Sequence, residues 1–240
     1  TYESHPEADT MATVRDGNKG VLIVVDVQVG VMKSAWEAPR VVRNVARAVE
    51  RARGMGVPVI WVQHSDDDLP YASPDWQWAP ELVPAAGEPL IHKHFNSSFE
   101  QTALEQELAE LGATHITLAG AATNWCIRAT AYGALERGYD LTLVKDAHTT
   151  ESMALDDGTR IEAASLIDDL NITMTWVSYP GRNSSTAKAE EANFSGPAGS
   201  APSRAARLVR IPPPRAVLAL RGVVGVAERG RARAVASGTA

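Results

Sequence analysis

Short apolar runs alternate with amphipathic stretches through the first three quarters of the chain. Val21–Val25 is an unbroken, largely β-branched run that ends at Asp26, which is typical of a strand buried on both faces of a parallel sheet. Arg40–Met55 instead places its apolar residues at helical spacing. The remaining patterns predict strands at 57–62, 90–92, 115–119, 141–144 and 172–177, and helices at 99–111, 127–137 and 158–170.

Strands that alternate with helices of these lengths predict βαβ units joined by right-handed crossovers. We therefore expect an α/β fold, namely a three-layer αβα sandwich around a mostly parallel, Rossmann-like central sheet. This domain is expected to comprise residues 18–183, preceded by an N-terminal extension at 1–17. The connection 64–89 is long for a compact domain, and connections of that length are usually functional.

Residues 184–240 differ in composition from the rest of the chain. They are rich in Ala, Arg, Gly, Pro and Ser, and from residue 187 onward nine basic side chains outnumber three acidic ones. Such a segment cannot bury much apolar surface, so we expect a basic tail that is mostly outside the fold and poorly ordered. A basic tail can bind an acidic surface, but an incidental extension is the favoured interpretation.

The overall composition is that of a globular protein. The 240 residues are 45% apolar and 22% charged, and the formal net charge is −6, which argues against a nucleic-acid partner. No uncharged apolar run approaches the ~20 residues of a membrane span, and the first twenty residues lack a signal-peptide pattern. The single cysteine suits a reducing compartment. We expect a cytoplasmic protein with neither a membrane nor a nucleic-acid partner.

Three reactive side chains follow three of the predicted strands. Asp26 ends the first, Lys93 follows the short strand at 90–92, and Cys126 lies in the turn after 115–119. Ligands of such sheets bind beyond the carboxyl ends of the strands, so these residues are expected to converge. A thiol near a helix N-terminus is also expected to have a stabilised thiolate. Each residue alone has a plainer interpretation, as a turn aspartate, a surface lysine or an inert buried cysteine.

The motifs around these residues resemble those of a known family. They are Asp26–Gln28, Lys93 with Ser98–Phe99, and the Gly-x-x-Thr-x-x-Cys turn at Gly120–Cys126. Their order and spacing resemble the cysteine-hydrolase superfamily, which includes isochorismatase-like proteins, nicotinamidases, N-carbamoylsarcosine amidases and streptothricin hydrolases. The resemblance covers about residues 19–178.

The resemblance implies a catalytic triad of Asp26, Lys93 and Cys126. Cys126 would attack a carbonyl to form a thioester, Asp26 would carry the proton, and Lys93 would hold the charge of the site. It also implies an oxyanion hole from the N–H groups of Ala122 and Cys126, and a cis peptide between Ala121 and Ala122. A small-molecule substrate, no cofactor, and a homodimer or homotetramer are further expectations.

Substrate contacts are expected from residues beside the triad. Gln28 belongs to the first motif, and Thr123, Asn124 and Trp125 precede the cysteine. Trp125 is the strongest of these candidates. Asn124 either donates to a substrate carbonyl or caps the helix.

A metal site is the main feature that separates nicotinamidases from other members of the superfamily. Nicotinamidases carry Asp-x-His and a further His after the second strand, whereas this chain has His64 followed by Asp66–Asp68 and no other His before His92. A metal bound by His64 with Asp66 or Asp68 is one interpretation. We favour a solvated acidic loop without a metal, which argues against nicotinamidase activity.

The favoured function is therefore hydrolysis of a C–N bond in a small amide, carbamoyl or lactam. The alternatives are isochorismatase-type hydrolysis of a vinyl ether, and a non-enzymatic redox or binding module that uses the single cysteine. A dinucleotide-binding domain would need Gly-x-Gly-x-x-Gly after the first strand, where this chain has Asp26–Gly30.

Overall fold

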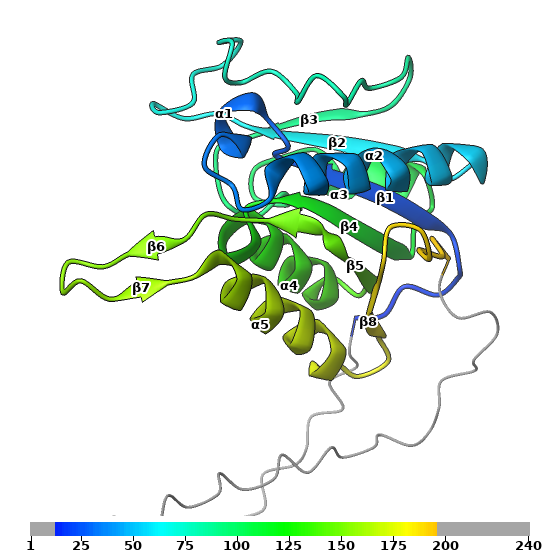
Figure 1. Ribbon diagram of the computed structural model, residues 1–240. Coiled ribbons are helices and arrows are strands. Elements are labelled where there is room, and N and C mark those ends of the chain that lie inside the picture. The colour runs from blue at the N-terminus through cyan, green and yellow to red at the C-terminus, as the bar shows by residue number, and fades with distance from the viewer. Residues whose placement is uncertain (1–12, 196–240) are drawn as a thin grey trace, which may run out of the picture. The chain divides into compact units, whose positions relative to one another are not determined.

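The computed structural model describes residues 13–195, and within them six parallel strands form one sheet (Figure 1). The strand order is β3-β2-β1-β4-β5-β8. From β1 the chain adds β2 and β3 on one side, and then returns to add β4, β5 and β8 on the other. The boundary between β1 and β4, which pair at the centre, is therefore the switch point at which such sheets bind ligands. The strands are β1 Gly20–Val25, β2 Val59–His64, β3 Leu90–Lys93, β4 His115–Ala121, β5 Asp140–Thr149 and β8 Ser184–Ala187.

Helices cover both faces of the sheet, which confirms the predicted three-layer sandwich (Figure 1). Helix α2, Ala38–Gly54, packs its apolar stripe on one face with residues such as Leu22 and Val24. Helices α3, α4 and α5 pack on the other face, around Ile23 and Leu118. Their bounds are α3 Leu104–Glu110, α4 Arg128–Glu136 and α5 Ala163–Trp176; the short α1 is Val29–Met32, and β6 Met153–Ala154 pairs with β7 Arg160–Ile161 as a hairpin.

The predicted strand at 172–177 is wrong, because α5 continues to Trp176. Ile172, Thr173 and Thr175 favour a strand locally, but Leu170 and Met174 are buried four residues apart on one helical stripe. Burial of that stripe against the sheet therefore overrides the local preference.

The predicted start of the tail at residue 184 is also wrong. Ser184–Ala187 forms β8 at the edge of the sheet, and Ala189, Ala192 and Phe194 are buried behind it. The sequence Ser-Ser-Thr-Ala has no apolar run, so its pattern does not indicate a strand. The expectations for residues 1–12 and 196–240 lie outside the described residues.

Gly120 allows the two central strands to meet closely at their carboxyl ends. Its φ of +129° lies outside the range that L side chains adopt readily, and a Cβ there would lie 1.9 Å from the main-chain oxygen of Val25. The residue after Val25 is Asp26 and the turn after Gly120 carries Cys126, so this contact positions two candidate site residues. No helix within residues 13–195 is long and apolar enough to cross a membrane.

Candidate active site

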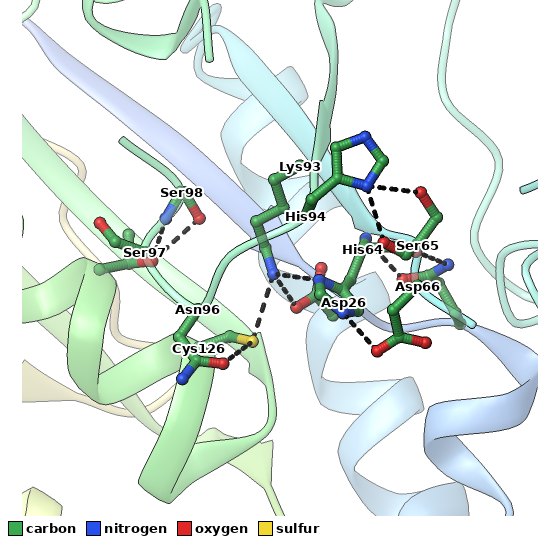
Figure 2. A network of polar contacts seen from close by, with 12 residues as sticks. Asp26, His64, Ser65, Asp66, Lys93, His94, Asn96, Ser97, Ser98 and Cys126 are labelled. Atoms are coloured by element: carbon green, nitrogen blue, oxygen red, sulfur yellow. Dashed lines mark hydrogen bonds and ion pairs between the residues drawn. The ribbon is translucent and has the colours of Figure 1, made fainter. Parts of the chain in front are cut away.

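The structure brings Asp26, Lys93 and Cys126 together at the carboxyl edge of the sheet (Figure 2). Asp26 follows β1, Lys93 ends β3, and Cys126 lies in η1, a π-helical turn at Thr123–Ile127 that follows β4. The Lys93 Nζ lies 2.7 Å from Asp26 Oδ2 and 3.2 Å from Cys126 Sγ. Three strands thus supply one carboxylate, one ammonium and one thiol to a single buried cluster.

Asp26 is buried without the hydrogen bonds that such a carboxylate normally has. Its residue is 2% exposed, and within residues 13–195 neither carboxylate oxygen has an aligned hydrogen-bond partner. The 2.7 Å contact with Lys93 is therefore an ion pair of poor hydrogen-bond geometry. Asp26 also has a left-handed φ of +52°, which is uncommon outside glycine and costs free energy. A carboxylate held in this way retains lone pairs that can accept a proton.

Burial, together with the charge of Asp26, keeps the thiol protonated. The pKa of Cys126 is raised from 9.0 to about 12, first by burial and then by Asp26, and Lys93 opposes both. Burial also disfavours the charged form of Lys93, but Asp26 and then Cys126 outweigh it and raise the pKa of Lys93. Our expectation of a stabilised thiolate is therefore wrong for the resting site, because desolvation exceeds any stabilisation by the turn.

Sequence reasoning missed two neighbours of the cluster, His64 and Asn96. Lys93 Nζ lies 3.4 Å from His64 Nδ1, and the His64 Nε2 lies 2.8 Å from an oxygen of Asp66. Because the ammonium can only donate, His64 Nδ1 accepts its hydrogen bond, and Nε2 carries the proton and donates a hydrogen bond to Asp66. The Asn96 Oδ1 lies 3.9 Å from the Cys126 sulfur. The available signal for His64 was its place at the end of β2, where it pairs in register with Lys93.

His64 and Asp66 are bonded to each other, and Asp66 also organises its own loop. Its Oδ1 accepts the N–H groups of Asp68 and Leu69, and its hydrogen bond with His64 is the main cause of its lowered pKa. Within residues 13–195 there is no group of three or more His, Cys, Asp or Glu side chains arranged to hold a metal ion.

Gln28 is buried, and its side chain is bonded to the main chain. The amide donates to the main-chain oxygens of His64 and Trp76 at 3.0 and 2.8 Å and accepts the N–H of His64 at 2.9 Å. A substrate contact by Gln28 stays a prediction. Its bonds attach the loop after β2 to the end of β1.

Of the three predicted contacts before the cysteine, only Trp125 borders a cleft. Thr123 is fully buried and its hydroxyl is hydrogen-bonded to His148, so its substrate contact stays a prediction. The Asn124 amide oxygen accepts a hydrogen bond from the hydroxyl of Thr150 at 2.6 Å, so this oxygen is bonded to the protein itself. Trp125 is about half exposed and lines the cleft. Pattern and spacing locate these residues on the turn but do not give the direction of their side chains.

The cleft beside the cluster of Asp26, Lys93 and Cys126 is acidic. It has a volume of about 420 Å³ and is bordered by Trp125 and by Ala121 and Ala122, whose peptide bond is cis as the resemblance implies. Among the described residues, no lysine or arginine lines it, whereas four carboxylates do. They are Asp66, Asp68, Asp75 and Glu151, of which Asp75 is paired with Lys33.

Comparison with known proteins agrees with these motifs. Residues 20–168 match the family model described as the isochorismatase domain. A streptothricin hydrolase of Streptomyces noursei is 33% identical over 151 residues, which are 60% of this chain and 58% of that protein. A second one from the same organism is 32% identical over 54% of this chain and 49% of its own length, so the chain spans only about half of these relatives.

Solved structures share the fold. An isochorismatase from Pseudomonas putida superposes with a TM-score of 0.63 at 28% identity, over 71% of this chain and 88% of that one. A cysteine hydrolase from Pseudomonas syringae pv. phaseolicola has a TM-score of 0.66 over 71% and 89%, and at 20% identity it supports the fold alone.

Proposed function

The chain belongs to the isochorismatase family of hydrolases, and on that basis we propose that it cleaves a C–N bond of a small amide, carbamoyl or lactam through a thioester on Cys126. The observation that carries this proposal is the position of the Lys93 ammonium, which lies within 3.2 Å of both the Asp26 carboxylate and the Cys126 sulfur. A vinyl-ether hydrolase has no need of a nucleophilic thiol, whereas amide hydrolysis by a covalent route does.

In the proposed reaction, Asp26 first accepts the thiol proton while the sulfur attacks the substrate carbonyl carbon. The new C–S bond gives a tetrahedral intermediate, whose collapse breaks the C–N bond as Asp26 returns the proton to the leaving nitrogen. Asp26 then takes a proton from water, the resulting hydroxide attacks the thioester, and the acid leaves as the thiol is reprotonated. Lys93 remains positively charged throughout.

The raised pKa of Cys126 is consistent with this sequence of proton transfers. The resting site pairs a carboxylate with an ammonium and keeps the thiol neutral. When the proton moves to Asp26, the sulfur becomes the negative partner of the same ammonium, 3.2 Å away. One buried positive charge therefore has one negative partner before and after the transfer, which avoids an unpaired buried ion.

The proposed oxyanion hole consists of the N–H groups of Ala122 and Cys126. Ala122 borders the cleft directly before η1, so its main chain is accessible to a substrate that reaches the sulfur. Fixed main-chain donors at such a position typically contribute ~10²-fold or more to the rate.

The charge of the cleft favours a neutral or cationic substrate. Isochorismate carries two carboxylates, and the cleft offers four carboxylates and, among the described residues that line it, no lysine or arginine in return. This disfavours the vinyl-ether alternative. Two relatives are named streptothricin hydrolases, so streptothricin is the first named compound to test.

A redox-sensing role for the cysteine is also disfavoured. Sensor cysteines are exposed and have a low pKa, whereas Cys126 is 8% exposed and its pKa is raised to about 12. Assembly into a homodimer or homotetramer stays a prediction, which sedimentation of the full chain would test.

The proposal is tested with a panel of small amides, carbamoyl compounds, lactams including streptothricin, and isochorismate. We expect turnover of at least one C–N substrate, loss of turnover in Cys126→Ser, and an acyl adduct on Cys126 detected by mass spectrometry of acid-quenched samples. Turnover that Cys126→Ser retains, or hydrolysis of isochorismate alone, would contradict the proposal. Parallel assays with a chelator test the loop of His64 and Asp66, since loss of activity there would indicate a metal.

A further inference from the structure

His148 is a buried titratable residue with no part in the proposed reaction. It lies near the end of β5 and is 1% exposed. Its Nδ1 lies 2.9 Å from the Thr123 hydroxyl, and its Nε2 lies 3.0 Å from the Asn171 amide oxygen. The imidazole thus connects helix α5, which carries Asn171, to the first residue of η1.

The donor and acceptor of each hydrogen bond from Asn171 through His148 to Thr123 can be assigned. The Asn171 amide nitrogen donates to the main-chain oxygen of Lys145 at 3.1 Å, so its oxygen must accept from His148. His148 Nε2 therefore carries a proton. Burial lowers the pKa of His148 to about 4, so the ring is neutral at physiological pH and Nδ1 has a free lone pair. It follows that the Thr123 hydroxyl donates to Nδ1.

The hydrogen bond of Thr123 to His148 can affect Cys126 because Thr123 and Cys126 belong to the same turn. Thr123 begins η1 and Cys126 lies within it. The Thr123 side chain is fully buried and is not among the residues that line the cleft. The bond from Thr123 to His148 on β5 is directional, so it reduces the freedom of the turn to shift its sulfur relative to Lys93.

We propose that His148 is a positioning residue, which holds the turn of Cys126 through the hydroxyl of Thr123. The consequence is the 3.2 Å contact between the Cys126 sulfur and Lys93, the interaction that opposes burial and Asp26 and favours the thiolate. This inference rests on the proposed role of Cys126 as the nucleophile.

Two substitutions of His148 each remove one of its two hydrogen bonds and keep the other. In His148→Asn the amide oxygen lies near the former Nδ1, so the acceptor for Thr123 is retained and the bond to Asn171 is lost. In His148→Gln the amide nitrogen lies near the former Nε2, so the reverse holds. Thr123→Val removes the hydroxyl at nearly constant shape, and Thr123→Ser restores it.

A second buried histidine offers a matched control. His115 begins β4, and its Nε2 lies 2.9 Å from the hydroxyl of Thr142 on β5, at the opposite end of the same strand pair. Thr142→Val therefore removes a buried hydroxyl, which is also bonded to Ser185, at the end of the strands remote from the turn of Cys126.

The experiment measures the rate at which iodoacetamide alkylates the folded protein, in which Cys126 is the only thiol. A ¹³Cβ label on that cysteine reports its position independently by NMR. We expect Thr123→Val and His148→Gln to slow alkylation about 10-fold and to shift the resonance, with no further loss in the double variant. Thr123→Ser, His148→Asn and Thr142→Val should stay within about 2-fold of wild type.

Rates that are unchanged or faster in Thr123→Val and His148→Gln, or an unmoved resonance, would overturn the proposal, as would equal slowing by Thr142→Val. Additive losses in the double variant would also overturn it, because the two groups would then act independently. These results are distinct from failure of the proposed function, which turnover by Cys126→Ser would reveal whatever the alkylation rates.

Discussion

Replacement of Asp26 by Asn should make the thiol more reactive while it strongly slows hydrolysis. Asp26 is the second cause, after burial, of the high pKa of Cys126. Asp26→Asn removes that negative charge at constant shape and leaves the buried Lys93 ammonium without a carboxylate partner. The thiol is then the nearest group that can supply a negative charge, so the thiolate should form more easily.

The magnitude follows from the pKa of Cys126. With a pKa of about 12, only ~10⁻⁴ of the molecules carry a thiolate at pH 8, compared with ~10⁻¹ for a thiol at the ordinary 9.0. A neighbouring charge typically shifts a pKa by ~1–3 units. Alkylation of Cys126 by iodoacetamide in Asp26→Asn should therefore accelerate by at least about 10-fold. Hydrolysis should fall by ~10²-fold or more because the proposed general base is lost.

The assay follows alkylation and turnover in parallel as a function of pH. Asp169→Asn is the matched control, because it changes net charge equally at an exposed ion pair with Arg128. Opposite changes in the two rates are expected for Asp26→Asn, and no change for the control. If alkylation slowed together with turnover, Asp26 would be activating the resting thiol directly, and the account of the raised pKa would be refuted.

Three further predictions concern stability and specificity. The pKa of His148 falls from 6.5 to about 4 on folding, so the unfolded chain binds a proton at higher pH than the folded one. The contribution of neutral His148 to the free energy of unfolding is therefore fully present above pH 6.5 and should decrease by ~3 kcal/mol as the pH falls to 4. Urea titrations should find this dependence in the wild type and not in His148→Asn. Gly120→Ala, whose Cβ would lie 1.9 Å from a main-chain oxygen of β1, should destabilise by at least ~2 kcal/mol, whereas Gly54→Ala in α2, with no atom within 4 Å, should stabilise by up to ~1 kcal/mol. Because the cleft is acidic, the anion iodoacetate should alkylate Cys126 more slowly than neutral iodoacetamide. The ratio of the two rates should decrease by about 3-fold in an Asp68→Asn, Glu151→Gln double variant and at high salt. An unchanged ratio would contradict the electrostatic argument.

Periodicity was sufficient to locate five of the six strands of the described sheet. Those five are apolar enough for the run itself to be diagnostic, whereas β8 is Ser-Ser-Thr-Ala and depends on pairing with β5. Residues 172–177 failed in the opposite way, since β-branched side chains imitate a strand although the stripe through Met174 is helical. Both errors have one cause: pairing and packing partners distant in sequence decide between elements whose local preferences are weak.

The three candidate reactive residues could be placed because each is tied to the end of a strand. Strand ends in a parallel sheet share one edge, so topology alone brings Asp26, Lys93 and Cys126 together. Substrate contacts have no such constraint. Gln28 and Thr123 lie close in sequence to the candidate reactive residues but turn their side chains into the protein, where each satisfies buried polar groups. The direction of a side chain after a turn depends on torsion angles that hydrophobic patterning does not encode.

The hydrogen-bond inventory supports Asp26 rather than Lys93 as the proposed general base. A base must have a lone pair free in the resting state. Lys93 has a raised pKa, and its ammonium lies 2.7, 3.2 and 3.4 Å from atoms of Asp26, Cys126 and His64, so it is a donor without a free lone pair. Asp26 has two buried oxygens without aligned donors among the described residues. A proton leaving the thiol therefore finds its acceptor on the carboxylate, and the His64 contact keeps the ammonium in place while that carboxylate changes charge.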